Sequence, residues 1–141
     1  MELVAKASAR GAPVVHGGMT TFTALEFAAL QSIFAETPGL TAGLERQLDC
    51  AIVTERENSG WGFFTTISVQ GDVPPVDSPR MLGLETLARI HGLEHGFGFV
   101  LYMEGGCLSL LEGYAQGGES TAAFDLTNLH FKVYRPSLQT G

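Results

Sequence analysis

The sequence predicts an α+β domain in which two N-terminal helices pack on an antiparallel meander sheet of about five or six strands. Apolar residues recur at helical spacing up to residue 48 and then alternate with a period of two from residue 51 onward. The 18 glycines among 141 residues favour tight turns over long helices. A Gly-Gly pair at 105–106 divides the most apolar segment into two halves, which is typical of a β-hairpin.

The chain is expected to divide into three parts. Residues 1–20 are small and irregular and predict a loosely ordered N-terminal arm. Residues 21–136 predict a single α+β domain, because this length ordinarily holds one domain and a hydrophobic content of 45% can build one core. Residues 137–141 are expected to be a tail.

The first helix has a clear start signal. Thr23 is a favourable N-cap and Glu26 follows three residues later, which completes a capping box. Glu26 falls inside the apolar arc of the helix, but the capping role explains it without a catalytic one. Phe22 and Phe27 have the spacing of a hydrophobic staple, so Phe27 is expected on the buried face. A second, shorter helix is expected over residues 42–48.

Strands are expected at residues 51–57 and 61–69, around an Asn-Ser-Gly turn. The second strand alternates most regularly, which places Trp61 and Phe63 on one face and Phe64 on the other. These aromatic residues are expected mainly in the core, and an exposed one among Trp61 and Phe64 would mark a contact surface.

The segments on either side of the hairpin differ in regularity. The proline-rich residues 71–80 predict an exposed loop. Residues 82–91 alternate like a strand, although a helix over the same residues stays open. Residues 91–96 predict a glycine-bracketed turn into the hairpin, and the last strand is expected at residues 129–134.

The hairpin of residues 97–114 is the centre of the predicted core. Strict pairing outward from the Gly-Gly turn places Phe99 opposite Glu112 and Phe97 opposite Tyr114. Glu112 then lies among aromatic side chains, where a carboxylate is ion-paired, protonated or at the edge of a pocket. The simpler alternative is that Glu112 reaches solvent at the end of the hairpin. The candidate pocket residues are Glu112, Arg89, His91, His95 and Tyr114.

The same register places Gly98 opposite Gly113 on the other side of the hairpin. Two neighbouring positions without side chains leave a recess, and a packed helix is its expected occupant.

The sequence carries few chemical motifs. His91 and His95 are the most metal-like pair, but residues four apart in extended chain are separated by about 13 Å, so neither a metal site nor a cofactor is predicted. Nucleophile and nucleotide-binding motifs are missing from the sequence, which leaves an enzymatic role uncertain and disfavoured. Cys50 and Cys107 are expected to be free, mostly buried thiols in a reducing compartment.

The charge balance narrows the class of partner. The net charge is −7, and the eight Lys and Arg residues are scattered along the sequence, which argues against nucleic-acid and anionic-membrane binding. No membrane-spanning run or signal peptide is visible, so a cytoplasmic location is expected. An acidic surface suits a basic protein partner, and a homodimer formed through sheet edges stays open.

Three short motifs carry a resemblance to other proteins. The segments G-W-G-F-F-T at 60–65, H-G-F-G-F-V-L at 95–101 and L-E-G-Y at 111–114 resemble a group of small uncharacterised bacterial proteins with GFFT, HGxGFxL and LExY strands in this order. The resemblance covers roughly residues 50–115 and implies no activity. In size and charge the chain is also similar to the immunity proteins of bacterial toxin systems.

The function expected from the sequence is therefore a non-enzymatic protein-binding module. The alternative is a small ligand-binding domain or enzyme with a pocket around Glu112 and His91 or His95.

Overall fold

The computed structural model describes residues 21–136 of the chain. The arm predicted for residues 1–20 and the tail predicted for residues 137–141 lie outside this range. Two helices come first, α1 (Ala24–Ala35) and α2 (Thr41–Asp49). The strands that follow are β2 (Ala51–Asn58), β3 (Gly62–Val69), β4 (Met81–Leu82), β5 (Leu87–Ile90), β6 (Phe97–Glu104), β7 (Cys107–Ala115) and β8 (Phe131–Tyr134), with a short 3-10 helix, η1 (Gln116–Gly118), after β7.

The strands form one seven-stranded sheet, in which every pair is antiparallel. The α+β class with an antiparallel sheet is thus confirmed, whereas the prediction of five or six strands was too low. The strand order is β2-β3-β7-β6-β5-β8, with β4 paired to β6. The sheet is not a simple meander, because β7 lies between β3 and β6 and β8 returns to pair with β5.

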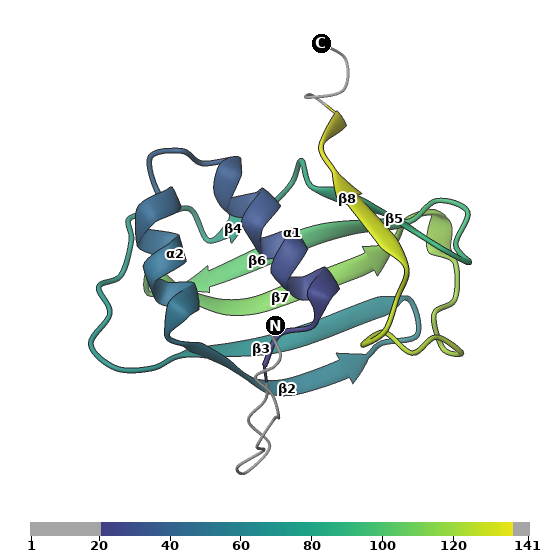
Figure 1. The fold of residues 1–141 in the computed structure, drawn as a ribbon, viewed down its shortest axis with the longest axis horizontal. Coiled ribbons are helices and arrows are strands. Elements are labelled where there is room, and N and C mark those ends of the chain that lie inside the picture. The colour runs from purple at the N-terminus through teal and green to yellow at the C-terminus, as the bar shows by residue number, and fades with distance from the viewer. Residues whose placement is uncertain (1–20, 137–141) are drawn as a thin grey trace.

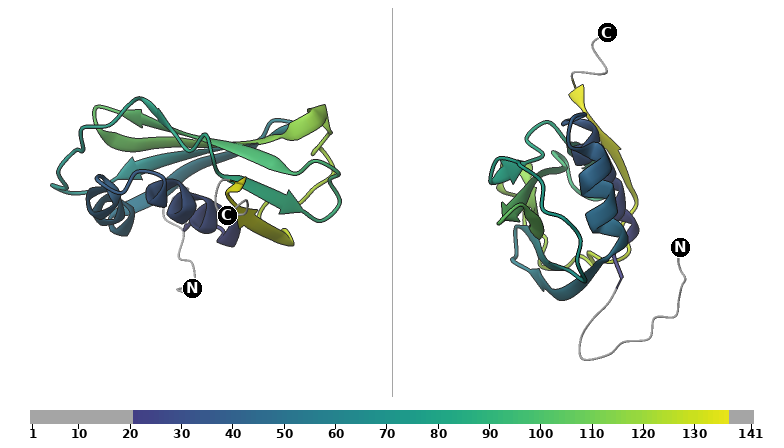
Figure 2. Two further views of the ribbon diagram at one scale, coloured as in Figure 1. Left: turned by 90° about the horizontal axis from the view of Figure 1, so that it is seen from above. Right: turned by 90° about the vertical axis from the view of Figure 1, so that its left-hand side faces the viewer.

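The two helices lie on one side of the sheet, and β8 lies on that side too, next to α1 (Figures 1 and 2). Apolar side chains from the helices and from the inner side of the strands form one buried cluster. The largest fully buried apolar side chains in it are Leu30, Ile33, Phe34, Leu44, Phe97, Phe99, Leu101 and Leu111. The opposite side of the sheet carries no helix of the described chain (Figure 2). Neither α1 nor α2 is long and apolar enough to cross a membrane.

The predicted start of α1 is confirmed in detail. The Thr23 hydroxyl accepts a hydrogen bond from the Glu26 backbone N–H at 3.1 Å, and the Glu26 carboxylate accepts one from the Thr23 N–H at 2.8 Å. The prediction for Phe27 was wrong, since its side chain is 50% exposed. The buried stripe of α1 contains Glu26, and Phe27 lies at its margin.

The predictions for the middle of the chain are largely correct. Residues 71–80 contain no helix or strand, as expected. The ambiguity over residues 82–91 is resolved in favour of strand, although β4 and β5 are two short strands separated by a turn. Cys50 is exposed rather than buried, because it is the C-terminal cap of α2.

A buried amide links α2 to the turn of the hairpin. The Gln47 side chain is fully buried, and its nitrogen donates to the backbone carbonyls of Pro74 at 3.2 Å and Gly106 at 2.9 Å. Its oxygen accepts a hydrogen bond from the Leu108 N–H at 2.9 Å. One side chain therefore joins the helix, the proline-rich loop and the hairpin.

The β6–β7 hairpin has the predicted turn but a different register. Both turn glycines have positive φ, 61° at Gly105 and 80° at Gly106, as a tight hairpin requires. The first two predicted pairs form, and then Ser109 is left without a partner in a β-bulge. Beyond the bulge the pairing is shifted by one residue, so that Glu112 lies opposite Val100 instead of Phe99.

The bulge places the residues of β7 beyond Ser109 on the side of the sheet opposite to the predicted one. A shift of one residue moves every following side chain to the other side of the sheet. The predicted register, which placed Glu112 opposite Phe99 on the core face, is therefore wrong, whereas the burial of Glu112 was left open by the sequence. The side chains of Leu111 and Ala115 point to the core together with the Gly113 position, whereas Leu110, Glu112 and Tyr114 point away from the helices.

Gly98 and Gly113 were predicted to be cross-strand partners, but they lie on different faces of the hairpin. A Cβ on Gly98 would lie 2.5 Å from the Tyr114 ring, and a Cβ on Gly113 would lie 2.3 Å from the Phe63 ring. Each glycine is thus covered by an aromatic ring from the neighbouring strand. The expected helix over a shared glycine recess is replaced by these two rings.

Candidate functional site

The strands β3, β7 and β6 present a continuous helix-free surface, which we call the outer face. The pairing register places Phe64, Glu112 and Val100 in one row across it, and Thr66, Leu110 and Tyr102 in the next. Their side chains are all partly buried, and Met81 extends the second row with a side chain that is 51% exposed. The outer face consists of Phe64, Thr66, Met81, Val100, Tyr102, Leu110, Glu112 and Tyr114.

Glu112 lies near the middle of the outer face and is held by one neighbour. The Tyr102 hydroxyl donates a hydrogen bond to Glu112 Oε1 at 3.0 Å. This hydrogen bond, partial burial and the negative charge of Glu112 raise the pKa of Tyr102 above its usual value. Within residues 21–136, Glu112 has no ion-pair partner. The second carboxylate oxygen can therefore accept a hydrogen bond from a cationic group outside the domain.

The surroundings of Glu112 are acidic. Glu55 and Glu57 lie in β2, are exposed, and pair in register with Thr66 and Phe64 of the outer face. The strands β2, β3, β7 and β6 contain a single basic residue, Arg56, which points toward the helices. The outer face therefore combines apolar side chains with uncompensated carboxylates.

The other candidate pocket residues separate into two groups. Arg89, His91 and His95 line one open depression of about 500 Å³ near the start of β6, and Glu112 is not part of it. Tyr114 lies on the outer face with its ring over Gly98. The structure therefore does not bring Glu112 together with either histidine.

His95 has a local structural role. Its ring packs against the backbone at Gly117, where an added Cβ would lie 2.5 Å from it. The backbone N–H groups of Glu94 and His95 both donate to the Glu119 carboxylate at 2.9 Å. These two hydrogen bonds lower the pKa of Glu119. Residues 21–136 contain no cluster of three metal-ligating side chains.

The aromatic contact candidates are both accessible. Trp61 is 63% exposed, although the alternation pattern placed it on the core face with Phe63. It lies in the turn just before β3, where the alternation does not extend. Phe64 is partly buried on the outer face.

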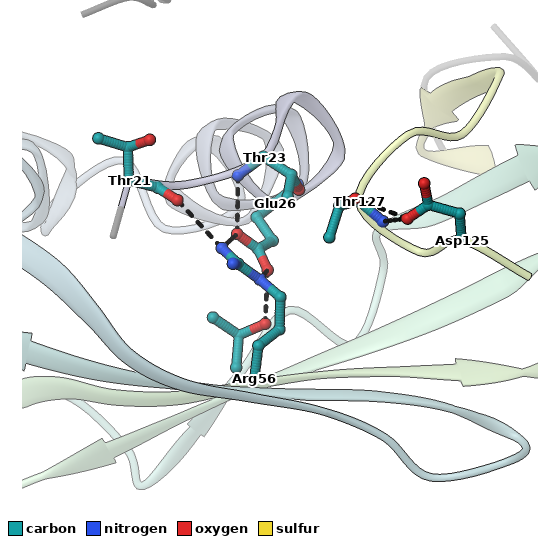
Figure 3. A network of polar contacts seen from close by, with 7 residues as sticks. Thr21, Thr23, Glu26, Arg56, Asp125 and Thr127 are labelled. Atoms are coloured by element: carbon teal, nitrogen blue, oxygen red, sulfur yellow. Dashed lines mark hydrogen bonds and ion pairs between the residues drawn. The ribbon is translucent and has the colours of Figure 1, made fainter. Parts of the chain in front are cut away.

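A polar network that the sequence did not predict lies between α1 and β2 (Figure 3). Arg56 binds the Glu26 carboxylate through two nitrogens, each at 2.7 Å, and the Thr65 hydroxyl donates to it at 2.6 Å. With the Thr23 N–H, the Glu26 carboxylate accepts four hydrogen bonds. Because these donors occupy both oxygens, Glu26 is a structural residue and not a catalytic base. The sequence signal for this network is a carboxylate inside the apolar face of a helix, and the capping role alone does not account for its contacts with Arg56 and Thr65.

Comparison of the chain with protein-family models, with curated proteins and with solved structures found no match. The resemblance to small bacterial proteins with GFFT, HGxGFxL and LExY strands therefore stays a prediction.

Proposed function

We propose that this protein is a non-enzymatic protein-binding module that holds a basic protein partner on its outer face, in the manner of an immunity protein that holds a toxin. The observation that carries this proposal is the combination of partly exposed apolar side chains with carboxylates that have no cation beside them. Exposed apolar surface with a polar rim is typical of protein interfaces. The comparison with immunity proteins rests on size and charge.

The electrostatics of the outer face favour a cationic partner. Glu112 is fixed by Tyr102, so its carboxylate loses little conformational freedom when a partner binds. An Arg or Lys of the partner that reaches Glu112 is surrounded by Phe64, Val100 and Leu110, which exclude water from the ion pair. Glu55 and Glu57 at the β2 edge add long-range attraction, which accelerates association.

The shape of the surface favours a protein over a small molecule. The open hollow beside Tyr102 has a volume of about 430 Å³ and is bordered by Arg80, Met81 and Glu104. A small ligand there would stay largely exposed, whereas functional ligand pockets enclose most of the ligand surface. The hollow is suited instead to an apolar side chain of a partner whose other residues cover the rest of the outer face.

A cross-linking experiment in the native host tests this proposal. A photo-reactive benzoylphenylalanine is placed at position 64 on the outer face, and in a matched chain at position 27, an exposed phenylalanine on α1. We expect a discrete adduct with a basic protein from position 64 only. The same adducts from both positions, or none from position 64, would contradict the proposal, and an adduct between two copies of this chain would replace the partner with a homodimer.

The identified partner then allows a sharper test. Glu112→Gln preserves the shape of the side chain and removes its charge, so the affinity should fall and its dependence on salt should weaken. Glu45→Gln, on α2, is the matched control and should leave the affinity unchanged.

A further inference from the structure

Basic side chains gather at the end of the sheet formed by β5 and β8, although they are scattered in the sequence. Arg89 and Lys132 are direct cross-strand partners in this pair of strands. One position beyond the strand on each side, the His91 N–H donates to the His130 carbonyl at 2.9 Å, and the two imidazole rings lie 6.2 Å apart. We call Arg89, His91, His130 and Lys132 the basic corner.

The basic corner has no internal counter-charge. Within the described part of the chain, none of its four residues forms an ion pair. All four line the open depression of about 500 Å³, in which the one acidic lining residue is Glu94. Like charges placed directly opposite each other on neighbouring strands destabilise a sheet. An anion bound between Arg89 and Lys132 would remove this repulsion.

Arg89 is held in a defined orientation. Its guanidinium carbon lies 4.7 Å from the centre of the Tyr134 ring, over the ring. Stacking on an aromatic ring leaves the N–H groups of a guanidinium free at its edge. Arg89 makes no side-chain hydrogen bond to any residue between 21 and 136, so these donors are available to a ligand in the depression.

We propose that the basic corner is a binding site for a phosphate group, either free inorganic phosphate or a phosphomonoester of a small molecule. Arg89 and Lys132 supply two permanent positive charges, which match the charge of a phosphate dianion near neutral pH. The planar Arg89 fork offers two parallel donors to two phosphate oxygens, and the His91 and His130 rings border the same hollow. A carboxylate, with one charge, would compensate only half of the pair.

This site is independent of the proposed protein interface, because it lies on other strands and has the opposite charge. The rest of the domain is acidic, so an anion is attracted to this corner and repelled elsewhere. Failure to bind phosphate would therefore not count against the proposed protein interface on the outer face. Failure to find a protein partner would likewise not count against the phosphate site.

The test is an NMR titration of the ¹⁵N-labelled full-length chain with inorganic phosphate, with phenyl phosphate and with acetate, at ionic strength held constant by sodium chloride. The wild type is compared with Arg89→Gln/Lys132→Gln. The control is Arg46→Gln/Arg80→Gln, which removes two exposed arginines outside the depression and causes the same change in net charge.

We expect saturable phosphate-dependent shifts at the amides of residues 89–91 and 130–132 in the wild type and the control. In Arg89→Gln/Lys132→Gln the affinity should fall by about tenfold or more, since two charge-assisted contacts are lost. Tighter binding of phenyl phosphate would identify an ester as the preferred source, and equal binding would identify free phosphate.

Shifts that do not saturate, that appear equally with acetate, or that are the same in both double variants would overturn the proposal. If the double variant does not give the spectrum of a folded protein, Arg89→Lys replaces it. This variant keeps the charge but loses the two-pronged donor and the stacking, and must still weaken phosphate binding.

Discussion

The Tyr102 hydroxyl and the Glu112 carboxylate meet diagonally across β6 and β7, with the donor and acceptor oxygens 3.0 Å apart. The contact exists only because Ser109 is left out of the pairing, which places Glu112 on the same face as Tyr102. A carboxylate that strict alternation would have placed on the core face thereby lies partly exposed on the outer face, where a neighbouring phenol orients it.

Replacing Glu112 by Gln should lower the pKa of Tyr102 toward its usual value. The substitution removes the strongest acceptor of the Tyr102 hydroxyl and the negative charge that disfavours the phenolate. The ultraviolet absorbance of tyrosinate during a pH titration, with Tyr114 and Tyr134 replaced by Phe in both chains, measures this change. Glu57→Gln, in the same row of the sheet, is the control and should leave the titration of Tyr102 unchanged.

The same contact should affect stability at high pH. The pKa of Tyr102 is raised in the folded state, so its contribution is present below the unfolded value of 10.0 and is lost as the pH rises through the higher folded value. Urea denaturation at a series of pH values above 9 should therefore show a steeper loss of stability in the wild type than in Glu112→Gln. Equal slopes would mean that Glu112 does not influence Tyr102 in solution.

Removing Arg56 should destabilise the fold by about 2–3 kcal/mol. This is less than the usual cost of breaking a fully buried ion pair, because the Arg56 side chain is 22% exposed and solvent weakens the interaction. In Arg56→Met, Glu26 keeps its buried charge but loses two of its four hydrogen bonds. Urea denaturation monitored by circular dichroism gives the free energy of unfolding. Arg46→Met, at an exposed position of α2, should change it by less than about 0.5 kcal/mol.

Shortening Gln47 to Ala should cost about 3 kcal/mol, because two carbonyls and one N–H lose their buried partner. Gln31→Ala is a matched control, since the Gln31 amide makes one hydrogen bond, to Glu45, and is only partly buried. Its cost should be below about 1 kcal/mol. Thermal denaturation of both variants distinguishes these values, and similar costs would show that the Gln47 contacts do not stabilise the fold.

The two glycines of the hairpin should respond differently to Ala. Gly113→Ala forces the buried Phe63 ring to move and should destabilise the domain by about 1–3 kcal/mol. Gly98→Ala meets Tyr114, which is 38% exposed and can swing outward, so a smaller cost is expected. Tyr114→Ala should abolish most of the cost of Gly98→Ala in a double-mutant cycle. Additive effects would contradict the contact.

The elements that could be predicted from the sequence depend on local signals. The capping box fixed the start of α1 because Thr23 and Glu26 interact within one turn of chain. The hairpin turn was equally clear, since two adjacent glycines permit the positive φ that the turn requires. Both features involve residues at most three positions apart.

The register of β7 could not be read from its alternation. Leu108, Leu110 and Leu111 give both possible faces an apolar side chain, so the pattern does not show where a bulge lies. One warning was present: strict pairing buried the Glu112 carboxylate among aromatic side chains, which is costly. Shifting the register by one residue removes this cost and places Gly113 under the Phe63 ring.

Contacts between segments that are distant in the chain could not be predicted from the sequence. The basic corner joins Arg89 to Lys132 across more than forty residues, and only the strand order brings them together. The network around Glu26 likewise needs Arg56 and Thr65 from two different strands. Single-sequence patterns carry no information on which distant strands pair.

The position of β8 makes the basic corner the last feature of the domain to be completed during synthesis. The ribosome makes Arg89 and His91 with their strand, but Lys132 and His130 follow only after the hairpin and the long segment behind it. Until then, the β5 edge has no strand where β8 will pair. Phosphate binding at this corner would therefore require that β8 has already been added to the β5 edge.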